Sequence, residues 1–256
     1  MNYSEKFKLK NKTAFVLGGS GLVGKEVSKA LLDCGAKVVI LDKINRLQKN
    51  QNKFNFEIID VSKPINIDKN YKKIIKKHSI PDIFINCSYP RTTDWSKNSF
   101  SQINYKSFKK NIEIHLNSFS WIAKIVAESM KSKKKGGSII QLSSIYGVVG
   151  QDLTIYEGTK MKESMTYSII KGGINNLTRL MASYYGRDNI RVNVLCAGGV
   201  FDNQNKKFVK KYNKKTPLKR MAKADEIASS AVFLASDAAS YITGSLFMVD
   251  GGWTAI

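Results

Sequence analysis

Short apolar runs alternate with longer amphipathic stretches along most of this chain. The apolar runs are rich in Val, Ile and Leu and predict strands near residues 13–18, 37–42, 55–59, 82–86, 138–142, 190–195 and 246–249. The amphipathic stretches predict helices near residues 22–34, 65–78, 101–132, 165–186 and 224–236. Such alternation is typical of an α/β fold, so we expect a doubly wound parallel sheet of about seven strands with helices on both faces.

The organisation of the chain indicates one domain. Its 256 residues contain no internal repeat and no low-complexity linker, so we expect a single domain over residues 1–256. In an open parallel sheet the binding crevice lies beyond the carboxyl ends of the strands. Three segments break the alternation after predicted strands, and we expect them to line a site: residues 87–100, 144–164 and 197–222.

The composition is that of a globular protein. Hydrophobic residues make up 43% and charged residues 24%, which excludes disordered, collagen-like and fibrous chains. No apolar run approaches the roughly 20 residues of a membrane span, and the N-terminus lacks the features of a secretory signal. Cys34, Cys87 and Cys196 are far apart and form no Cys-x-x-Cys pair. We therefore expect reduced thiols, no metal site, no membrane partner and a cytoplasmic protein.

The net charge of +22 raises the question of an anionic partner. Only six of the 42 basic residues are arginines, whereas base recognition and phosphate binding depend heavily on arginine geometry. Many lysines stand beside Asn and Ile, as in residues 69–77. We therefore favour a solvated, lysine-rich surface over a nucleic-acid partner, and another anionic partner stays open as the alternative.

A glycine-rich turn follows the first predicted strand directly. It spans Gly18, Gly19, Ser20, Gly21, Leu22, Val23 and Gly24. Gly19, Gly21 and Gly24 have the G-x-G-x-x-G spacing, which lets backbone N–H groups and a helix N-terminus approach a pyrophosphate. An ordinary tight turn between strand and helix is the alternative. The position between strand and helix favours a dinucleotide site.

Two carboxylates at predicted strand ends bear on the choice of dinucleotide. Asp42 lies 18 residues beyond Gly24, where a carboxylate would bond both hydroxyls of the adenosine ribose and repel a 2′-phosphate. We therefore expect NAD rather than NADP, although the adjacent Lys43 speaks for NADP. Asp60 and Val61 are expected at the adenine edge. The alternative for Asp42 is a plain turn residue.

Candidate acid/base residues lie in the second half of the chain. Tyr167 and Lys171 are four residues apart in a predicted helix and therefore project from one face. Ser143 and Ser144 end a predicted strand and bring a hydroxyl to the crevice. A Tyr–Lys pair at this spacing is common by chance, so its weight comes from this serine and from the glycine turn upstream.

These motifs make the chain resemble the short-chain dehydrogenase/reductase family over nearly its whole length. The residues that carry the resemblance, in family order, are the glycine turn, Asp60-Val61, Ile85-Asn86, Ser143-Ser144, Tyr167-x-x-x-Lys171, residues 190–194, 217–221 and 233–237, Tyr241-Ile242-Thr243-Gly244, and Val249-Asp250-Gly251-Gly252. The resemblance implies a single-domain, NAD(P)-binding Rossmann fold and hydride transfer between nicotinamide and a carbonyl/alcohol pair. It also implies a homo-oligomer, a tetramer or a dimer.

The resemblance also assigns roles to individual residues. Tyr167 would be the general acid/base, its pKa drawn toward neutrality by the nearby Lys171. Ser144 would bond the substrate oxygen, and Lys171 would also hold the nicotinamide ribose. The expected nucleotide contacts are Gly18, Gly19, Ser20, Gly21, Leu22, Val23, Gly24, Asp42, Asp60, Val61, Asn86, Cys87, Ser88, Tyr167, Lys171, Gly198 and Val200.

The chain departs from the family pattern at several positions. His115 stands where the family usually has an Asn that supports a proton relay, so we expect a catalytic histidine, with a structural buried histidine as the alternative. Asn111 lies one turn away, but its spacing from Leu116 does not match. Other departures are the Gly18, Gly21, Gly24 spacing and Ala197 in place of the usual proline.

Two further departures concern the substrate. Tyr89 and Arg91 follow Asn86, where the family commonly reads Asn-Asn-Ala-Gly, and would narrow or charge the mouth of the crevice. Ser144 and Tyr167 are 23 residues apart, roughly ten more than is common in the family, and the added chain lies within residues 146–160. Together these features resemble a bacterial subgroup associated with flagellin modification and nonulosonic-acid biosynthesis. We expect Gln151 and Tyr156 to contact a polar, sugar-like small molecule.

Two other functions remain as alternatives. The chain could reduce a 3-oxoacyl thioester, with its basic surface docking an acidic carrier protein, although Asp42 and the polar insertion speak against this. It could also be a non-enzymatic nucleotide- or nucleic-acid-binding protein on the same fold. The intact set of Ser144, Tyr167 and Lys171 favours an enzyme.

Overall fold

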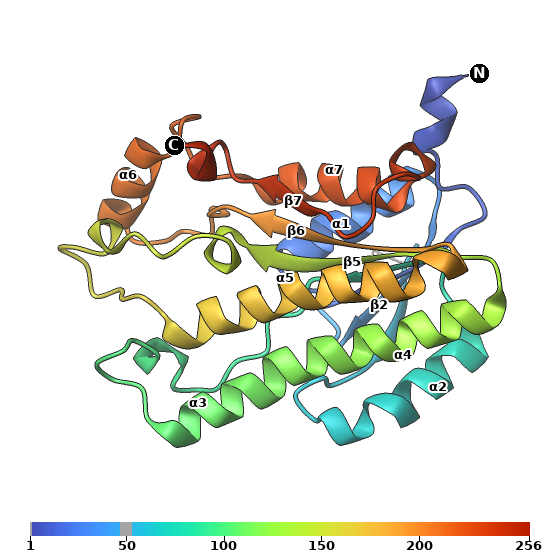
Figure 1. The fold of residues 1–256 in the computed structure, drawn as a ribbon, viewed down its shortest axis with the longest axis horizontal. Helices are drawn as coiled ribbons and strands as arrows, with labels where there is room; N and C mark the ends of the chain where they lie inside the picture. The colour runs from blue at the N-terminus through green and yellow to red at the C-terminus, as the bar shows by residue number, and fades with distance from the viewer. Residues whose placement is uncertain (1, 47–52) are drawn as a thin grey trace.

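The computed structural model describes residues 2–46 and 53–256, and its centre is one parallel sheet (Figure 1). The strands are β1 (Thr13–Leu17), β2 (Lys37–Asp42), β3 (Asn55–Ile58), β4 (Ile83–Asn86), β5 (Gly137–Ser144), β6 (Ile190–Ala197) and β7 (Leu246–Val249). Their order across the sheet is β3-β2-β1-β4-β5-β6-β7, with every pair parallel. The predicted seven-stranded parallel sheet is confirmed, and β5 and β6 run two residues further than expected at their carboxyl ends.

Helices cover both faces of the sheet. They are α1 (Leu22–Asp33), α2 (Ile67–His78), α3 (Tyr105–Asn111), α4 (Ser118–Lys133), α5 (Met165–Tyr185), α6 (Lys206–Lys215) and α7 (Ala224–Ala235). One apolar cluster joins the sheet to α2, α4 and α5, and a second joins its other face to α1 and α7. Val27 and Leu31 of α1 belong to the second cluster, as their helical spacing predicts. The doubly wound α/β architecture is therefore confirmed.

Two features of the helices differ from the sequence-based expectation. The helix expected over residues 101–132 begins at Tyr105 and is interrupted by a π-helical turn at Ile112–Asn117 before α4 continues to Lys133. The helix α6 was not expected; it lies beyond the carboxyl end of the sheet, next to the loop that follows β5 (Figure 1). Its apolar positions are few and lie among six lysines, which weakens the periodic signal.

The direction of strand ordering reverses between β1 and β4, and this point positions the site. Leu17 of β1 pairs with Asn86 of β4, so the segments that follow these two strands leave the sheet side by side. The N–H of Cys87 donates to the carbonyl of Leu17 at 2.8 Å. In open α/β sheets a ligand binds in the crevice at such a switch point.

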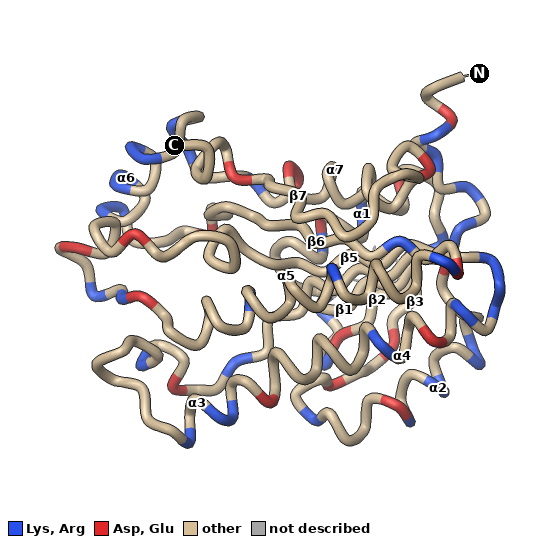
Figure 2. The backbone as a smooth tube through the Cα atoms, in the orientation of Figure 1, with Lys and Arg blue, Asp and Glu red and all other residues tan. Residues whose placement is uncertain are grey.

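The positions of the cysteines and of the basic residues are relevant to the predicted cellular environment and partners. Cys34, Cys87 and Cys196 are free thiols. Figure 2 shows Lys and Arg on α2, on α6 and on loops at both ends of the sheet. Within the described part of the chain, no helix is long and apolar enough to cross a membrane.

Candidate active site

The glycine turn is shaped by close backbone approach. Gly18 has a φ of +73°, and a Cβ there would lie 2.6 Å from the backbone of Ser88. A Cβ at Gly24 would lie 2.1 Å from the carbonyl oxygen of Gly18. Gly21 is less restricted, since its Cβ would approach that oxygen only to 3.3 Å. A Cβ at Gly19 would lie 2.9 Å from the side chain of Ile40 and 3.0 Å from the carbonyl oxygen of Val16, so Gly18, Gly19 and Gly24 are the glycines that the turn requires most.

The start of α1 has the features of an anion site. Its N-cap, Gly21, provides no side-chain capping bond, so the N–H groups of the first turn, which includes Leu22 and Val23, have no side-chain acceptor. The hydroxyl of Ser20 is buried without a hydrogen-bond partner. Uncapped N–H groups and a spare hydroxyl at a helix N-terminus fit the pyrophosphate of a dinucleotide.

The carboxylate of Asp42 adjoins the glycine turn, whereas that of Asp60 bonds a residue two positions further along the chain. The carboxylate of Asp42 accepts hydrogen bonds from the N–H of Ser20 at 3.1 Å and from the N–H of Lys43 at 2.8 Å. The carboxylate of Asp60 accepts from the hydroxyl and the N–H of Ser62. Val61 is buried in the core beside α2. The structure therefore places Asp42 next to the glycine turn.

The segments after β4 and β6 contribute further expected nucleotide contacts. The hydroxyl of Ser88 donates to the side-chain oxygen of Asn86 at 2.7 Å and fixes the turn opposite Gly18. Past β6, Gly198 is packed closely, since a Cβ there would lie 2.9 Å from the Cα of Asp250. Val200 follows in a parallel bridge with Ala222.

The three residues expected to carry the chemistry come together at the carboxyl end of β5. Ser144 is the last residue of β5; its hydroxyl accepts from the N–H of Tyr146 at 3.2 Å and lies close enough to Tyr167 of α5 to lower the pKa of that phenol. One helical turn further along α5, Lys171 is 3% exposed, and its Nζ lies 5.5 Å from the centre of the Tyr167 ring. That ammonium donates to the carbonyl of Leu142 at 2.9 Å. Tyr167 and Lys171 thus project from one face of α5, as their spacing of four residues predicts.

The pKa of Tyr167 departs from the sequence-based expectation. Burial raises the pKa of this phenol, and the neighbouring hydroxyl of Ser144 opposes the rise only in part. Burial also lowers the pKa of Lys171 to about 7. The prediction that Lys171 draws the pKa of Tyr167 toward neutrality is wrong for this structure, because desolvation disfavours the charged form of both groups.

His115 lies in the π-helical turn and is fully buried. Neither ring nitrogen has a hydrogen-bond partner. Its ring is 5.4 Å from that of Tyr89 and 5.0 Å from that of Phe119. Burial and, second, the charge of Lys171 lower its pKa well below the usual value. A neutral imidazole with two free nitrogens therefore adjoins the Tyr167–Lys171 pair.

Asn111, by contrast, bonds Thr92 and Ser107 and is a structural residue.

An aromatic cluster surrounds the phenol of Tyr167. The ring of Tyr89 lies edge-on to that of Tyr167 at 5.9 Å, and Arg91 covers Tyr89 at 5.3 Å. Trp95 completes the cluster at 5.6 Å from Tyr89 and 6.4 Å from Tyr167. Trp95 was not among the predicted site residues, although the segment 87–100 was expected to line the site and contains only this tryptophan.

The polar insertion residues are bonded within the protein. The side chain of Gln151 accepts from the N–H of Ser164 and the hydroxyl of Tyr156, and donates to the carbonyl of Ser164 and the hydroxyl of Ser168. Tyr156 stacks on Phe208 of α6 at 5.7 Å. Gln151 therefore ties the insertion to the start of α5, and Tyr156 ties it to α6.

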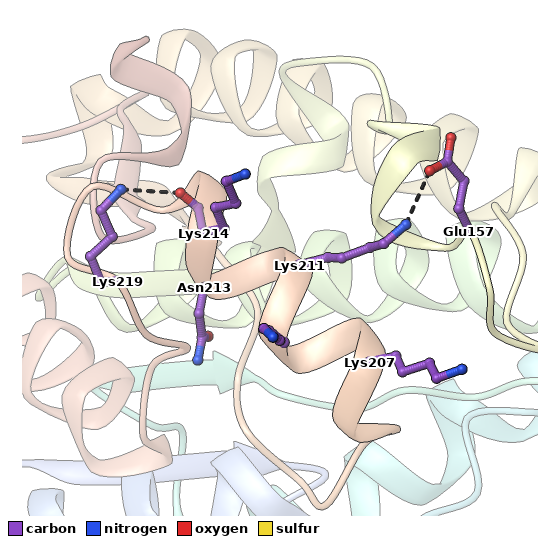
Figure 3. Close-up of a pocket in the computed structure, with 7 residues that line it drawn as sticks. Glu157, Lys207, Lys211, Asn213, Lys214 and Lys219 are labelled. Atoms are coloured by element: carbon purple, nitrogen blue, oxygen red, sulfur yellow. Dashed lines mark hydrogen bonds and ion pairs between the residues drawn. The ribbon is translucent and has the colours of Figure 1, made fainter.

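A lysine-lined hollow lies where α6 meets the insertion (Figure 3). It has a volume of about 550 Å³ and is lined by Glu157, Lys207, Lys210, Lys211, Asn213, Lys214 and Lys219. Lys211 is paired with Glu157 at 3.0 Å. None of the residues expected to bind nucleotide or to act on the substrate lines this hollow. Among residues 2–46 and 53–256 there is also no cluster of His, Cys, Asp and Glu that could hold a metal ion.

Comparison with known proteins decides the family. A family model described as enoyl-(acyl carrier protein) reductase matches residues 20–254. The chain is a short-chain dehydrogenase/reductase. This short-chain dehydrogenase/reductase is similar to the post-translational flagellin modification protein A of Campylobacter coli, with 35% identity over 96% of this chain and 99% of that protein. It is also 31% identical to a 3-oxoacyl-[acyl-carrier-protein] reductase of Buchnera aphidicola, over 96% and 98% of the two chains.

Solved structures support the same fold. A short-chain dehydrogenase from Leptospira borgpetersenii with bound NAD⁺ superposes with a TM-score of 0.86 at 30% identity, covering 99% of this chain and 96% of that one. A gluconate 5-dehydrogenase from Burkholderia cenocepacia in complex with NADP and tartrate superposes with a TM-score of 0.85 at 21% identity and full coverage of both chains, a likeness of fold alone. This short-chain dehydrogenase/reductase is accordingly an oxidoreductase of the Rossmann type.

Proposed function

We propose that this short-chain dehydrogenase/reductase is an NAD-dependent enzyme that transfers a hydride between nicotinamide and a secondary alcohol or ketone of a polar, sugar-like metabolite. The observation that carries the proposal is the convergence of Ser144, Tyr167 and Lys171 at the carboxyl end of β5. These three groups can position and protonate a substrate oxygen. The similarity to the post-translational flagellin modification protein A of Campylobacter coli agrees with the subgroup resemblance from which a sugar-like substrate is expected.

The chain's own residues fit a dinucleotide. The turn from Gly18 to Gly24 would hold the pyrophosphate with backbone N–H groups, and Asp42 would bond the adenosine ribose. Ser88, facing Gly18, and the segment at Gly198 would border the nicotinamide half. When bound, the nicotinamide donates or accepts the hydride. The negative charge of Asp42 favours NAD because it would repel a 2′-phosphate.

Tyr167 would act as the proton donor in the direction of ketone reduction. Because burial raises its pKa, the phenol is protonated at neutral pH and can give its proton to the carbonyl oxygen as that oxygen gains negative charge. Ser144 would donate a second hydrogen bond to the same oxygen. Lys171 would stabilise the phenolate that remains, and His115 would pass a proton toward Lys171 through water, since both its nitrogens are free.

We also propose that residues 1–256 form one NAD(P)-binding domain, that the enzyme is cytoplasmic and that it assembles into a dimer or tetramer. The cysteines Cys34, Cys87 and Cys196 are not joined in disulfides, which is compatible with a cytoplasmic enzyme. Light scattering after size exclusion tests the oligomer directly.

The experiment is an absorbance assay at the reduced-nicotinamide band, with NAD and NADP in parallel over amino sugars, sugar phosphates and nucleotide sugars. We expect NAD-dependent turnover of one class, reduced roughly 10²- to 10⁴-fold in Tyr167→Phe. Full turnover in Tyr167→Phe would refute the acid/base assignment. Tighter binding of NADPH than NADH would refute the choice of cofactor.

A second candidate function is reduction of a 3-oxoacyl thioester on an acidic carrier protein. The lysine-lined hollow at α6 favours it, since Lys207, Lys210 and Lys214 have no carboxylate within ion-pair distance among the described residues. The relative from Buchnera is named for this reaction. The assembled Ser144, Tyr167 and Lys171 speak against the non-enzymatic alternative.

Charge-matched variants separate the two candidates. Replacing Lys207, Lys210 and Lys214 by Gln should lower kcat/KM for an acetoacetyl carrier protein about tenfold if α6 docks the carrier. The control replaces three exposed lysines of α2, Lys72, Lys73 and Lys76, and removes the same charge elsewhere. An equal effect of both triple variants, or no turnover of this thioester by the parent protein, excludes a docking role for α6.

A further inference from the structure

Three aromatic rings meet at the reacting group. The planes of Tyr89 and Trp95 are 80° apart, those of Tyr89 and Tyr167 are 87° apart, and those of Trp95 and Tyr167 are 82° apart. All three ring centres lie within 6.4 Å of one another. The rings are thus nearly perpendicular in every pair, and one of them carries the hydroxyl assigned to proton transfer.

We propose that Trp95, together with Tyr89, forms an aromatic wall that selects a cyclic polyol by packing against the C–H face of its ring. This inference rests on the proposed function and specifies its substrate class. Aromatic faces are electron-rich, and the axial C–H groups of a sugar ring present a weakly positive, apolar surface. An open-chain substrate offers no such flat face.

Trp95 is fixed in place by two segments of the fold. Its carbonyl accepts from the side chain of Asn98 at 3.1 Å, and Asn98 is itself 1% exposed. The side-chain oxygen of Asn98 accepts from the hydroxyl of Thr166, and its carbonyl accepts from the N–H of Met165 at 3.0 Å. Trp95 is therefore tied to the first turn of α5, next to Tyr167, and the wall is preorganised.

The other end of the segment is equally restrained. The side chain of Asn111 accepts from the N–H of Thr92 at 3.0 Å and donates to its hydroxyl at 2.8 Å. The carboxylate of Asp94 accepts from the hydroxyl of Ser107 at 3.0 Å. These bonds anchor the loop that carries Trp95 to α3, so the wall is held in place by the protein itself.

The surroundings distinguish a sugar from an apolar ligand. Tyr89 is 42% exposed, so part of the wall is open to a ligand. Polar groups border it: the guanidinium of Arg91 lies over Tyr89, and Tyr167, whose hydroxyl is assigned to proton transfer, lies edge-on to Tyr89. A wall of rings bordered by hydrogen-bonding groups suits a ligand with one C–H face and several hydroxyls.

The test uses saturation-transfer NMR with the full-length protein and saturating NAD⁺. The probes are D-glucosamine and N-acetyl-D-glucosamine, and the acyclic D-glucitol serves as the control of similar polarity. We expect transfer to the C–H protons of one ring face, reduced at least fivefold in Trp95→Ala and largely kept in Trp95→Phe. Trp121→Ala, which removes a half-exposed tryptophan of α4, should have no effect. Unchanged NAD⁺ binding shows that each variant is folded.

The outcomes separate this inference from the proposed function. Equal transfer to glucitol, equal transfer in Trp95→Ala, or no transfer to either sugar overturns the wall. In steady-state assays of whichever substrate is turned over, Trp95→Ala should raise KM more than it lowers kcat. If turnover depends on Tyr167 but KM is unchanged in Trp95→Ala, the proposed oxidoreductase function stands and the aromatic wall is refuted. If sugar binding depends on Trp95 but no sugar is turned over, the wall stands and the proposed function is refuted.

Discussion

The ammonium nitrogen of Lys171 lies 5.5 Å from the centre of the Tyr167 ring and is bonded to the carbonyl oxygen of Leu142. A buried cation with a single carbonyl acceptor is costly to the folded state, and the pKa of Lys171 falls to about 7 for that reason. The fold therefore accommodates this lysine at the expense of stability.

Replacing this lysine should stabilise the protein at low pH. In the unfolded chain a lysine keeps its proton up to about pH 10.4. Below pH 7 both states are charged and the full burial cost is present, whereas between pH 7 and 10 the folded state sheds the proton and the cost declines. Lys171→Met should thus raise Tm by at least about 3 °C at pH 6, less at pH 9, while turnover is lost. A calorimetric gain in Tm that grows with pH would contradict this.

Two neighbouring glycines should respond differently to a methyl group. Gly24→Ala places a Cβ 2.1 Å from the carbonyl oxygen of Gly18, so the turn must move. We expect a loss of NAD⁺ affinity of at least about tenfold and a lower Tm. Gly21→Ala meets that oxygen only at 3.3 Å and should retain most of the affinity. Titration calorimetry of both variants measures the difference, and equal losses would show that a close backbone approach is not what the site requires.

The carboxylate of Asp42 should set the choice between the two dinucleotides. Asp42→Asn keeps a hydrogen-bond acceptor for Ser20 but removes the charge that would repel a 2′-phosphate. The ratio of the NADP⁺ to the NAD⁺ dissociation constant should fall about tenfold, which corresponds to about 1.4 kcal/mol. Asp60→Asn is the matched control, because that carboxylate is used by Ser62. A similar fall in the control would mean that overall charge, not position, decides the preference.

The bonds of Gln151 should hold the insertion in place. Gln151→Ala removes the acceptor of Tyr156 and the ties to Ser164 and Ser168, all of them half-buried, and should cost about 0.5–1.5 kcal/mol. Limited proteolysis within residues 151–164 should become faster. Thr154→Ala in the same insertion loses only a bond to Asp152 and should be cleaved at the parent rate. Protection that is unchanged in Gln151→Ala would show that other contacts hold this segment.

The strands and most helices could be predicted because each carries its own periodic signal. The apolar run before Gly18 is one such signal, and the stripe of Val27 and Leu31 is another. The helix α6 could not be recognised in this way because its buried face consists mainly of Phe208 and Tyr212. Their burial depends on Tyr156 and Trp253, which are far away in the sequence.

The site was predictable where a motif is local and unpredictable where it is assembled by the fold. The glycine turn and the Tyr167–Lys171 spacing are local. The place of Trp95 depends on a hydrogen bond between Asn98 and Thr166 across 68 residues. The substrate contact expected of Gln151 stays a prediction, and the bonds of its amide to Ser164 depend on the fold of the insertion. The direction of the Tyr167 pKa depends on burial, which residue spacing does not reveal.

The π-helical turn at residues 112–117 keeps a row of side chains in phase. Ser107, Asn111, His115 and Phe119 are each four residues apart and all buried. In a regular α-helix a row with this spacing would rotate by about 120° over twelve residues. The wider turn removes part of that rotation, and the hydroxyl of Ser118 bonds the carbonyls of Ile114 and His115 within it. A single-residue deletion here would therefore rotate the residues before the turn relative to α4. The helix α4 could still pack on the sheet, but His115 would no longer lie beside Tyr89 and Lys171.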